Sequence, residues 1–306
     1  MDAVILAGGF GKRLMPLTEH LPKPMLTICN LPMIDYCIAQ ASYYKIKNIF
    51  LTLAYKPEKI IDWCNGYNGI NFEYSVENKP LGTFGGVKKI ANKLSEMFFV
   101  LSGDGLNDID LEKMHKSHIK SGADITIAIT KSNTPWLFGV VETDNNGMVK
   151  SFYEKPTEYK GNTVNTGIYL INKKILNLLP DGNYDFAKDL FPLVLQYGKI
   201  NTFFHDGYWN DIGNPNSYYD SNFYVKEHSF FCNVKNREYN QIVQLHRDNN
   251  LIVSNSIING EVNNCIVGNR CNVKGNLNNC IVLDDSEVCG NFENCILANN
   301  NVIKIE

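Results

Sequence analysis

The sequence lacks any apolar run approaching the roughly 18 consecutive residues that a membrane-spanning helix needs. Its first six residues, MDAVIL, carry no basic segment of the kind that opens a signal peptide. With a net charge of -3 and a pI near 6.1, the chain also lacks a broad basic surface for a nucleic-acid backbone. We therefore expect a cytoplasmic protein with no membrane partner and no nucleic-acid partner.

Closely spaced cysteine pairs are also missing, although the chain contains nine cysteines. None of them forms a C-x-x-C pair, and a zinc site would need closer pairs with histidines nearby. The pattern favours reduced thiols that act as small core residues of a cytoplasmic protein. Five of these predicted core residues crowd the C-terminal region: Cys265, Cys271, Cys280, Cys289 and Cys295.

The chain does have a short apolar run near its start, and this run stops at residues 8–11, which include three glycines. A strand that ends in such a loop offers bare backbone N–H groups to an anion. Arg13 and Lys23 flank the loop with fixed positive charge. The pattern predicts a cradle for a triphosphate at the end of the first strand.

Two better-known glycine loops are excluded by their spacing. A Walker A loop places Ser or Thr directly after its Gly-Lys pair, but here Arg13 follows Lys12. A dinucleotide-binding fingerprint needs a third glycine three residues after the second, and Leu14 stands at that position.

The order Gly-Gly-x-Gly-x-Arg-Leu followed by Pro-Lys-Pro resembles the signature of the sugar-1-phosphate nucleotidyltransferases. Within that family, the segments at 164–167 (VNTG) and 185–192 (DFAKDLFP) look most like the bacterial mannose-1-phosphate guanylyltransferase type. The resemblance covers residues 1–225 closely and the rest loosely. One position departs from the family pattern, because Lys12 replaces the usual threonine before the arginine. A charged amine there differs in reach and charge from a hydroxyl at a phosphate contact.

The order of elements predicts an α/β fold. Strands are expected at 4–7, 49–54, 72–76 and 97–102, and helices at 33–44, 57–65 and 86–94. Such a series builds a mostly parallel sheet with helices on both faces, and ligands bind at the carboxyl ends of its strands. The resemblance implies the same architecture, a Rossmann-like mixed but mostly parallel sheet that is GT-A-like.

From residue 123 onward the predicted strands are longer and hairpin-like. They are expected at 124–130, 139–142, 149–154 and 167–171, with a turn at 144–147. We expect this half of the fold to contain the site for the acceptor substrate.

The C-terminal region repeats every fifteen residues, at 264–267, 279–282 and 294–297, with Asn-Cys-Ile followed by Val or Leu. Such repeats predict a solenoid of stacked β-coils, with an inward cysteine ladder and asparagines in the turns. An irregular β extension is the alternative. The resemblance implies a short left-handed β-helix that could form a homo-oligomer contact. The predicted organisation is a catalytic domain over 1–225, a connector over 226–250 and the tail over 251–306.

Two aspartates are candidates for metal binding. Asp104 follows the apolar run at 97–102, where a carboxylate can hold Mg²⁺ against triphosphate oxygens, although an ordinary turn aspartate would look the same. The resemblance places the metal aspartate of the family here, and it implies that Asp211 shares the metal with Asp104. The alternative for Asp211 is an N-cap of a helix near 215–224.

The segment from Pro80 to Gly86 resembles a family motif that lies against the base and the ribose. Phe84 replaces the usual alanine there, and we expect it to narrow the base pocket. Glu77 lies five residues before Gly82, where relatives hold a side chain that contacts the base. A carboxylate can accept both N1–H and N2–H of guanine, so we hypothesise that Glu77 favours guanine.

The implied reaction joins a nucleoside triphosphate to a sugar 1-phosphate and releases pyrophosphate, with positioning and charge neutralisation in place of a protein nucleophile. We predict GTP and mannose 1-phosphate as substrates and Mg²⁺ as cofactor. The predicted catalytic residues are Arg13, Lys23, Asp104 and Asp211, of which Asp104 and Asp211 bind the metal. The predicted nucleotide contacts are Leu6, Ala7, Gly8, Gly9, Gly11, Lys12, Arg13, Lys23, Glu77, Pro80, Gly82, Thr83 and Asp104. The predicted sugar-phosphate contacts are Gly139, Glu154, Lys155, Asn165, Thr166 and Gly167.

Other functions remain open. A glucose-1-phosphate uridylyl-, thymidylyl- or adenylyltransferase would share these motifs, and so would a catalytically silent regulatory subunit. A second acyltransferase activity is not expected, because the tail is short and has no histidine after residue 250.

Overall fold

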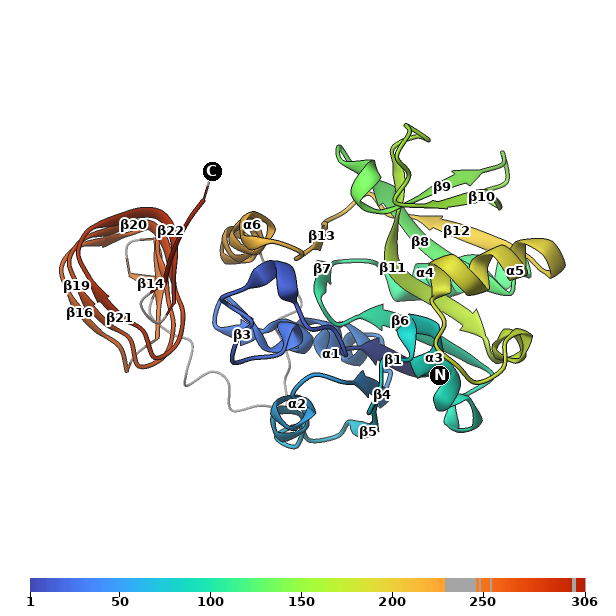
Figure 1. Cartoon of the computed structure of the whole chain (residues 1–306), viewed down its shortest axis with the longest axis horizontal. Helices are drawn as coiled ribbons and strands as arrows, with labels where there is room; N and C mark the ends of the chain where they lie inside the picture. The colour runs from blue at the N-terminus through green and yellow to red at the C-terminus, as the bar shows by residue number, and fades with distance from the viewer. Residues whose placement is uncertain (229–245, 248, 254, 299–300, 306) are drawn as a thin grey trace. The chain divides into compact units, whose positions relative to one another are not determined.

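The computed structural model describes residues 1–228, 246–247, 249–253, 255–298 and 301–305. The chain divides into two compact units, each built from three separate stretches. The first unit comprises residues 1–9, 37–57 and 69–209, and the second comprises residues 10–36, 58–68 and 210–306. Figure 1 shows the elements of both.

The first unit is built on a sheet whose strand order is β10-β9-β11-β6-β1-β4-β5, in which β8 also pairs with β11, and β12 pairs with β8. Its parallel part contains β1 (Asp2–Leu6), β4 (Asn48–Leu53), β5 (Asn71–Val76) and β6 (Met97–Ser102). These four strands lie within a residue or two of the predicted ones. Apolar runs in β1, β4 and β6 are buried almost throughout, as expected for strands covered on both faces.

The other part of this sheet is largely antiparallel. It contains β8 (Ile125–Lys131), β9 (Gly139–Thr143), β10 (Val149–Glu154), β11 (Thr163–Asn172) and β12 (Ile200–Phe204). The predicted turn at 144–147 joins β9 to β10, and Gly147 N–H donates to Asp144 O at 3.1 Å. Strand β11 is longer than predicted because it pairs with β6, β8 and β9, and its register with β8 shifts between Asn165 and Tyr169. Strand β12, which pairs with β8 in parallel, was not predicted.

Helices and short elements complete this part of the chain. The α-helices of the first unit are α3 (Gly82–Lys89), α4 (Leu111–Ser121) and α5 (Phe191–Tyr197). Helix α1 (Met33–Tyr43) begins in the second unit and ends in the first, and α2 (Pro57–Cys64) belongs to the second unit apart from Pro57. The shorter elements are η3 (Ala91–Lys93), β7 (Gly105–Asn107), η4 (Pro135–Leu137), η5 (Lys173–Leu178) and η6, a π-helical turn over Phe186–Leu190. Helix α4 was not predicted, although Asp110 caps its first turn by accepting from Lys113 N–H at 2.9 Å.

The start of α3 corrects the prediction of a helix over 86–94. The helix begins at Gly82 and ends at Lys89, although glycine weakens helices and three glycines stand in this segment. Tertiary contacts account for this start, because Tyr184 O accepts the N–H groups of Phe84 and Gly85 at 2.9 and 3.0 Å.

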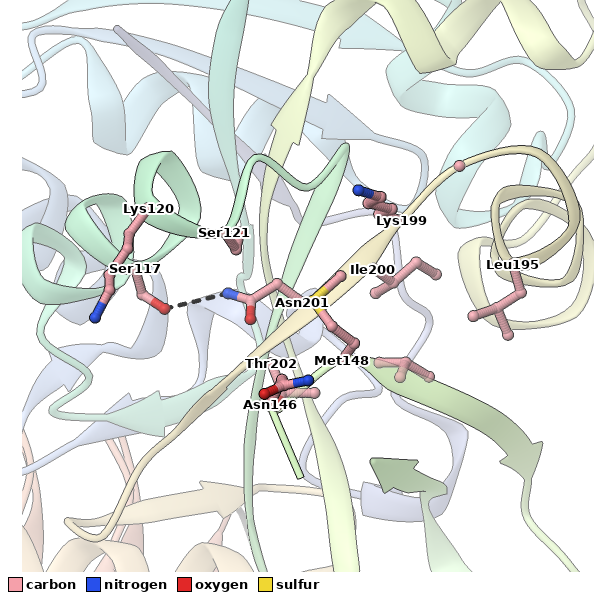
Figure 2. A pocket seen from close by; sticks show the side chains of 12 residues that line it. Ser117, Lys120, Ser121, Asn146, Met148, Leu195, Lys199, Ile200, Asn201 and Thr202 are labelled. Atoms are coloured by element: carbon pink, nitrogen blue, oxygen red, sulfur yellow. Dashed lines mark hydrogen bonds between the residues drawn. The ribbon is translucent and has the colours of Figure 1, made fainter. Parts of the chain in front are cut away.

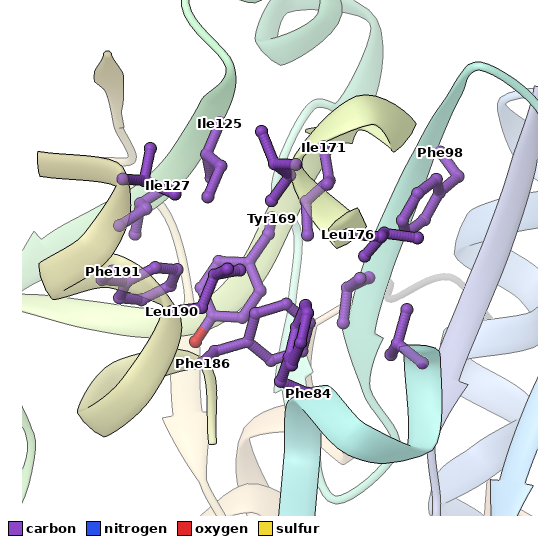
Figure 3. Packing of buried hydrophobic residues seen from close by; sticks show 14 of the residues in the cluster. Phe84, Phe98, Ile125, Ile127, Tyr169, Ile171, Leu176, Phe186, Leu190 and Phe191 are labelled. Carbon is purple, nitrogen blue, oxygen red and sulfur yellow. The ribbon is translucent and has the colours of Figure 1, made fainter. Parts of the chain in front are cut away.

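The main core of the first unit lies between the sheet and the helices α3 and α5. Aromatic rings gather at its centre, where Phe186 contacts Phe84, Tyr169 and Phe191 with ring centroids 5.5, 5.1 and 6.1 Å away (Figure 3). Burial of these large rings stabilises this half of the fold.

The second unit contains the segment after the glycine loop, helix α6 and the tail. Its first elements are η1 (Lys12–Leu14), η2 (Lys23–Met25), β2 (Thr27–Ile28) and β3 (Leu31–Pro32). Strand β13 (Trp209–Asp211) enters it from the first unit and leads into α6 (Pro215–Glu227).

The tail winds as stacked coils with the predicted fifteen-residue spacing (Figure 1). Its strands are β14 (His246–Arg247), β15 (Asn250–Ile252), β16 (Ile257–Asn259), β17 (Val262–Asn263), β18 (Ile266–Val267), β19 (Asn272–Lys274), β20 (Leu277–Val282), β21 (Glu287–Cys289), β22 (Phe292–Ala298) and β23 (Asn301–Lys304). In one wall, Ile281 pairs with Ile266 on one side and with Ile296 on the other. The solenoid is therefore confirmed over the irregular alternative, and its left-handed sense stays a prediction.

The cysteine and asparagine ladders occupy the predicted places. Cys265, Cys280 and Cys295 are buried in the coil core, and Asn264 and Asn279 adopt positive φ at the turns. One cysteine prediction is wrong: Cys289 is exposed, because it alternates with buried Val288 along β21. The eight cysteines of the described residues are free thiols, and Cys232 lies outside those residues.

No helix in the described part of the chain is long and apolar enough to cross a membrane. The predicted connector at 226–250 falls mostly outside the described residues.

Candidate active site

The glycine loop begins where β1 ends, as predicted. Leu6 is the last residue of β1, and Ala7 N–H donates to Thr52 O of the neighbouring strand at 3.0 Å. Gly8 lies close to Ala54, whereas a side chain at Gly9 would meet no atom within 4 Å. The loop therefore leaves the sheet at the carboxyl end of a parallel strand, with open space at Gly9.

Asp104 is positioned beside that loop by the same sheet. Strand β6 runs parallel to β1, and Gly103 N–H donates to Leu6 O at 3.0 Å. A Cβ atom at Gly103 would stand 2.8 Å from that carbonyl oxygen, so only glycine fits without a shift. The half-buried Asp104 accepts a 2.6 Å hydrogen bond from Ser102 Oγ. The sequence argument missed Ser102.

The charge of Asp104 acts on a neighbouring thiol, Cys37. Burial, together with the negative charge of Asp104, raises the pKa of the Cys37 thiol to about 12. The Cys37 thiol donates to Ser102 O at 3.2 Å, so it lies against the last residue of β6, two residues before Asp104. A carboxylate charge is thus concentrated at this end of β6.

In the second unit, Gly11 has the left-handed φ of +63° that favours glycine. Thr18 Oγ1 donates to Gly11 O at 2.9 Å and thereby closes the turn, a role that the sequence argument missed. Lys12 and Arg13 follow in η1, and both are exposed. The loop thus ends in two solvent-facing cations.

Lys23 and Asp211 form an ion pair within the second unit. Lys23 Nζ lies 3.6 Å from Asp211 Oδ1, and the two side chains are 6% and 31% exposed. The alternative prediction for Asp211 is wrong, because Asn214 caps α6 by accepting from Ser217 N–H at 2.9 Å. Asp211 is therefore not used as the helix cap.

Arg13 lies near the same carboxylate. A Cβ atom at Gly213 would stand 3.0 Å from Arg13 Nη2 and 3.3 Å from Asp211 Oδ2. Gly213 N–H donates to Asp211 O at 2.8 Å, which holds this turn closed. The second unit thus brings together three of the four predicted catalytic residues, Arg13, Lys23 and Asp211.

Predicted acceptor residues gather on β9, β10 and β11 of the first unit. Gly139 opens β9 opposite Glu154, the last residue of β10. A Cβ atom at Gly139 would stand 2.4 Å from Phe152 Cζ and 3.0 Å from Glu154 Oε2, so the absence of a side chain leaves room for both groups. Lys155 follows with a positive φ of 45°, and its exposed Nζ lies 4.0 Å from Glu154 Oε1. A carboxylate and a cation suit a sugar hydroxyl and a phosphate.

Asn165, Thr166 and Gly167 form the irregularity in β11. Asn165 Oδ1 accepts Gly167 N–H, and Asn165 Nδ2 donates to Tyr169 Oη, both at 2.9 Å. Thr166 is buried and its hydroxyl donates to Ala128 O, so that hydroxyl is engaged within the fold. Burial raises the pKa of Tyr169, and the charge of Glu154 adds to the rise. Tyr169 was missed at the sequence level, although it lies four residues from Asn165.

The predicted base-binding segment is anchored to the core. Thr83 Oγ1 donates to Asp185 Oδ1 at 3.0 Å and accepts from Phe186 N–H at 3.1 Å. Gly82 has a φ of +72° and packs against Tyr184 O. Pro80 is exposed just before this turn.

Glu77 already has a structural partner. One carboxylate oxygen accepts Leu81 N–H at 2.9 Å, and the other lies against Gly86. Burial raises the pKa of Glu77, and the hydrogen bond from Leu81 opposes that rise. Its contact with a guanine base stays a prediction.

The expectation for Phe84 is wrong. Its side chain is fully buried and makes an edge-to-face contact with Phe186, with centroids 5.5 Å apart. Phe84 stands where the family motif has alanine, and its ring fills the core beneath α3. It therefore does not narrow a pocket for the base.

A hollow in the first unit lies away from the predicted residues. Its volume is about 640 Å³, and it lies between α4, α5 and β12 (Figure 2). Asn201 lies at its centre and donates to Ser117 Oγ at 3.1 Å. None of the predicted site residues lines it.

Residues 2–228 match the nucleotidyl transferase family. A mannose-1-phosphate guanyltransferase of Aspergillus oryzae is 35% identical over 226 residues, which cover 71% of this chain and 62% of that protein. Among solved structures, HddC from Yersinia pseudotuberculosis in complex with GMP-PN is 30% identical with a TM-score of 0.64, over 73% of this chain and 99% of that chain. A putative glucose-1-phosphate thymidylyltransferase from Bacillus anthracis shares the fold, with a TM-score of 0.69. It is 24% identical, and the match covers 75% of this chain and 97% of that chain.

The family match and the identity together settle which family this is. The match covers most of the chain and includes the glycine loop, Asp104, the acceptor strands and Asp211. The chain spans about 62% of the length of the Aspergillus oryzae relative. On this evidence the chain belongs to the nucleotidyl transferase family, whose members act on nucleoside triphosphates and sugar 1-phosphates.

Proposed function

We propose that this protein transfers a guanylyl group from GTP to mannose 1-phosphate, giving GDP-mannose and pyrophosphate. The relatives named as mannose-1-phosphate guanyltransferases support the substrate pair, and the guanine nucleotide bound to HddC supports the base. The activity is proposed for this chain as it stands, which is shorter than those relatives.

The observation on which the proposal mainly depends is the Lys23–Asp211 pair. Lys23 is almost fully buried, and a buried ammonium is costly unless it has a partner. With Arg13 close to the same carboxylate, the second unit concentrates two cations and one anion around a single turn. Such a cluster suits a phosphate chain that carries a cation.

Members of this family generally use a divalent metal ion. We propose that this ion is Mg²⁺ and that Asp104 and Asp211 are its protein ligands, because Mg²⁺ prefers one or two carboxylates together with phosphate oxygens and water. The donor set fits, since both carboxylates are partly exposed and Asp104 is oriented by Ser102. When bound, the ion would supply charge neutralisation at the triphosphate.

The protein groups orient the reactants. Backbone N–H groups of the glycine loop hold the triphosphate, and Arg13 and Lys23 balance the charge that collects on the departing pyrophosphate. Glu154 and Lys155 position the sugar 1-phosphate. One of its phosphate oxygens attacks the α-phosphorus of GTP in line, a P–O bond forms, and the bond to pyrophosphate breaks with its electron pair leaving on oxygen.

Pyrophosphate release tests the proposal directly. GTP, UTP, dTTP, ATP and CTP would each be paired with the 1-phosphates of mannose, glucose, galactose and N-acetylglucosamine, with Mg²⁺ present. The fastest pair should be GTP with mannose 1-phosphate. If glucose 1-phosphate with UTP, dTTP or ATP reacts fastest, the protein is the corresponding glucose-1-phosphate nucleotidyltransferase instead. If folded protein releases no pyrophosphate with any pair, a regulatory subunit is favoured.

Two substitutions separate the site from the fold. Asp104→Asn and Asp211→Asn should each lower kcat at least about a hundredfold, because each removes a charge that neutralises the triphosphate. Asp206→Asn, at an exposed aspartate outside the predicted site, is the matched control and should keep wild-type activity.

We also propose that the protein acts in the cytoplasm and forms a homo-oligomer through its tail. Light scattering of the full chain tests the second point, because a monomer at micromolar concentration would contradict it.

A further inference from the structure

The coiled tail is joined to the rest of the second unit by side chains from two other elements. From α6, Tyr219 Oη donates to Asn279 O at 2.7 Å, and Lys226 Nζ donates to Asn264 Oδ1. From the β2–β3 turn, Asn30 Nδ2 donates to Val267 O at 3.3 Å. All of these acceptors lie on the stacked wall of the coils, so the tail is held at successive rungs.

The acceptor rungs are themselves fixed in place. Asn279 accepts from Asn264 Nδ2 at 2.8 Å and donates to Asn294 Oδ1 at 3.1 Å, which continues the asparagine ladder. These hydrogen bonds link the turns of successive coils. A side chain bonded to this ladder is therefore connected to more than one coil.

The two contacting elements lead directly to the ion pair. Asn210, the neighbour of Asp211, donates through Nδ2 to Ser221 Oγ of α6 at 2.8 Å. The β2–β3 turn is connected to Lys23 in a similar way, because η2, which contains Lys23, leads into β2. Leu26 N–H donates to Lys23 O at 3.1 Å. A shift of α6 or of the β2–β3 turn would therefore be passed to Asp211 or to Lys23.

Helix α6 and the β2–β3 segment are also hydrogen-bonded to each other by buried groups. Tyr218 Oη donates to Thr27 O at 2.6 Å, and Cys29 N–H donates to Asn222 Oδ1 at 2.9 Å. Together with the tail they form a closed loop of contacts: tail to α6, α6 to β2, and the β2–β3 turn back to the tail. Rigid supports of this kind hold functional groups within the few tenths of an ångström that a metal site requires.

We propose that the coiled tail sets the position of Asp211 relative to Lys23, and that Tyr219 and Asn30 are the positioning residues that transmit it. The inference depends on the proposed function in one respect, namely that Asp211 binds the metal. Neither residue touches a substrate in this scheme. Burial raises the pKa of Tyr219 to about 12, so its hydroxyl remains a donor to Asn279 over the whole working range of pH.

The test replaces the transmitting groups and measures metal affinity as well as turnover. Tyr219→Phe removes only the hydroxyl, and Asn30→Ala removes the second contact. Tyr197→Phe is the matched control, because Tyr197 lies at the end of α5 and is 77% exposed. Affinity for Mn²⁺ would be measured by electron paramagnetic resonance with the full chain and a non-hydrolysable guanine nucleotide, and the Mg²⁺ dependence of pyrophosphate release would be measured alongside it.

We expect Tyr219→Phe to raise the metal concentration for half-saturation by about threefold to tenfold, because a metal site loses affinity when its support is loosened. The double variant should show a larger shift, with kcat at saturating metal within about twofold of wild type and Tyr197→Phe unchanged. A support that acts only on stability would lower the unfolding midpoint and leave half-saturation unmoved, and that result would overturn the inference.

Asp211→Asn, measured in the same way, separates the two levels of the argument. If Asp211→Asn weakens Mn²⁺ binding and Tyr219→Phe does not, the positioning inference is wrong while the metal assignment stands. If Asp211→Asn binds Mn²⁺ like wild type, the metal assignment is wrong and the inference fails with it. If Tyr219→Phe weakens Mn²⁺ binding in a protein that turns over none of the tested substrate pairs, the inference stands and the proposed reaction does not.

Discussion

A Gly103→Ala substitution should displace the predicted metal-binding turn without altering Asp104 itself. Gly103 links the end of β6 to Asp104, and its N–H donates to Leu6 O at the point where the glycine loop begins. The added Cβ atom would stand 2.8 Å from that oxygen and 3.0 Å from Ile5 Cγ2. The first contact is with backbone, so no flexible side chain can move aside.

The size of the effect follows from this contact. A distance of 2.8 Å is 0.6 Å inside the 3.4 Å at which ordinary van der Waals contact begins, so the ends of β1 and β6 must separate by several tenths of an ångström. Overpacking of this kind costs about 1–3 kcal/mol of folding free energy. Since a catalytic group displaced by 1 Å can lose about a hundredfold in rate, we expect a loss of roughly tenfold in kcat.

The assay combines urea unfolding with pyrophosphate release over a range of Mg²⁺ concentrations. Gly122→Ala is the matched control, because Gly122 has a φ of +61° and its Cβ atom would meet nothing within 4 Å. The control should lose about 1 kcal/mol of stability through backbone strain alone. Its kcat and its Mg²⁺ half-saturation should equal those of wild type.

The comparison between the two variants decides the matter. Gly103→Ala should need several times more Mg²⁺ for half-saturation, whereas an equally destabilised control should not. If both variants lose stability and neither changes its Mg²⁺ dependence, the contact with Leu6 does not position Asp104, and the geometric reasoning is refuted.

Three further predictions concern other parts of the chain. Glu77→Gln should reduce the preference for GTP over UTP by about tenfold, since a charged acceptor is lost at the base, and an unchanged ratio of kcat/KM values would reject the guanine hypothesis. Burial lowers the pKa of His118, so below about pH 6.5 the unfolded chain binds a proton more readily than the folded chain does. The free energy of unfolding should therefore fall as the pH drops, by up to about 1.4 kcal/mol per pH unit. His118→Gln should flatten this slope in urea unfolding measured at pH 5 to 7. Asn279→Ala removes two ladder hydrogen bonds at a residue with positive φ and should cost about 2 kcal/mol in urea unfolding, whereas a cost near zero would show that the ladder adds nothing to the tail.

The parts of the fold that were predictable have strong local patterns. The buried runs of β1, β4 and β6 are continuous apolar stretches, which burial on both faces of a parallel sheet produces. The tail was predictable because each fifteen-residue repeat occupies one rung, so the sequence period equals the structural period. Cys289 is exposed although it lies in the repeat region, so membership of the repeat region does not by itself show that a side chain points into the core.

The parts that could not be predicted depend on contacts between distant segments. Helix α3 starts at Gly82 because Tyr184 O accepts two of its first N–H groups, and nothing within residues 80–86 signals this. Phe84 was assigned to a ligand pocket from its motif, but Phe186 and the core decide its place. The roles of Ser102 and Thr18 likewise become visible only once the residues they bond are brought beside them.

The Lys23–Asp211 pair has a consequence for how metal and nucleotide bind. In the protein alone, the ammonium of Lys23 shares the negative charge of Asp211 at 3.6 Å, so a cation that approaches Asp211 competes with it. A nucleotide phosphate gives Lys23 a second anionic partner and removes this competition, and the metal in turn leaves Lys23 available to the phosphate. By linkage the two ligands should strengthen each other's binding to the same degree. We therefore expect Mn²⁺ affinity to rise in the presence of nucleotide, and we expect Lys23→Met to reduce that rise, because it removes the cation through which the two sites are coupled.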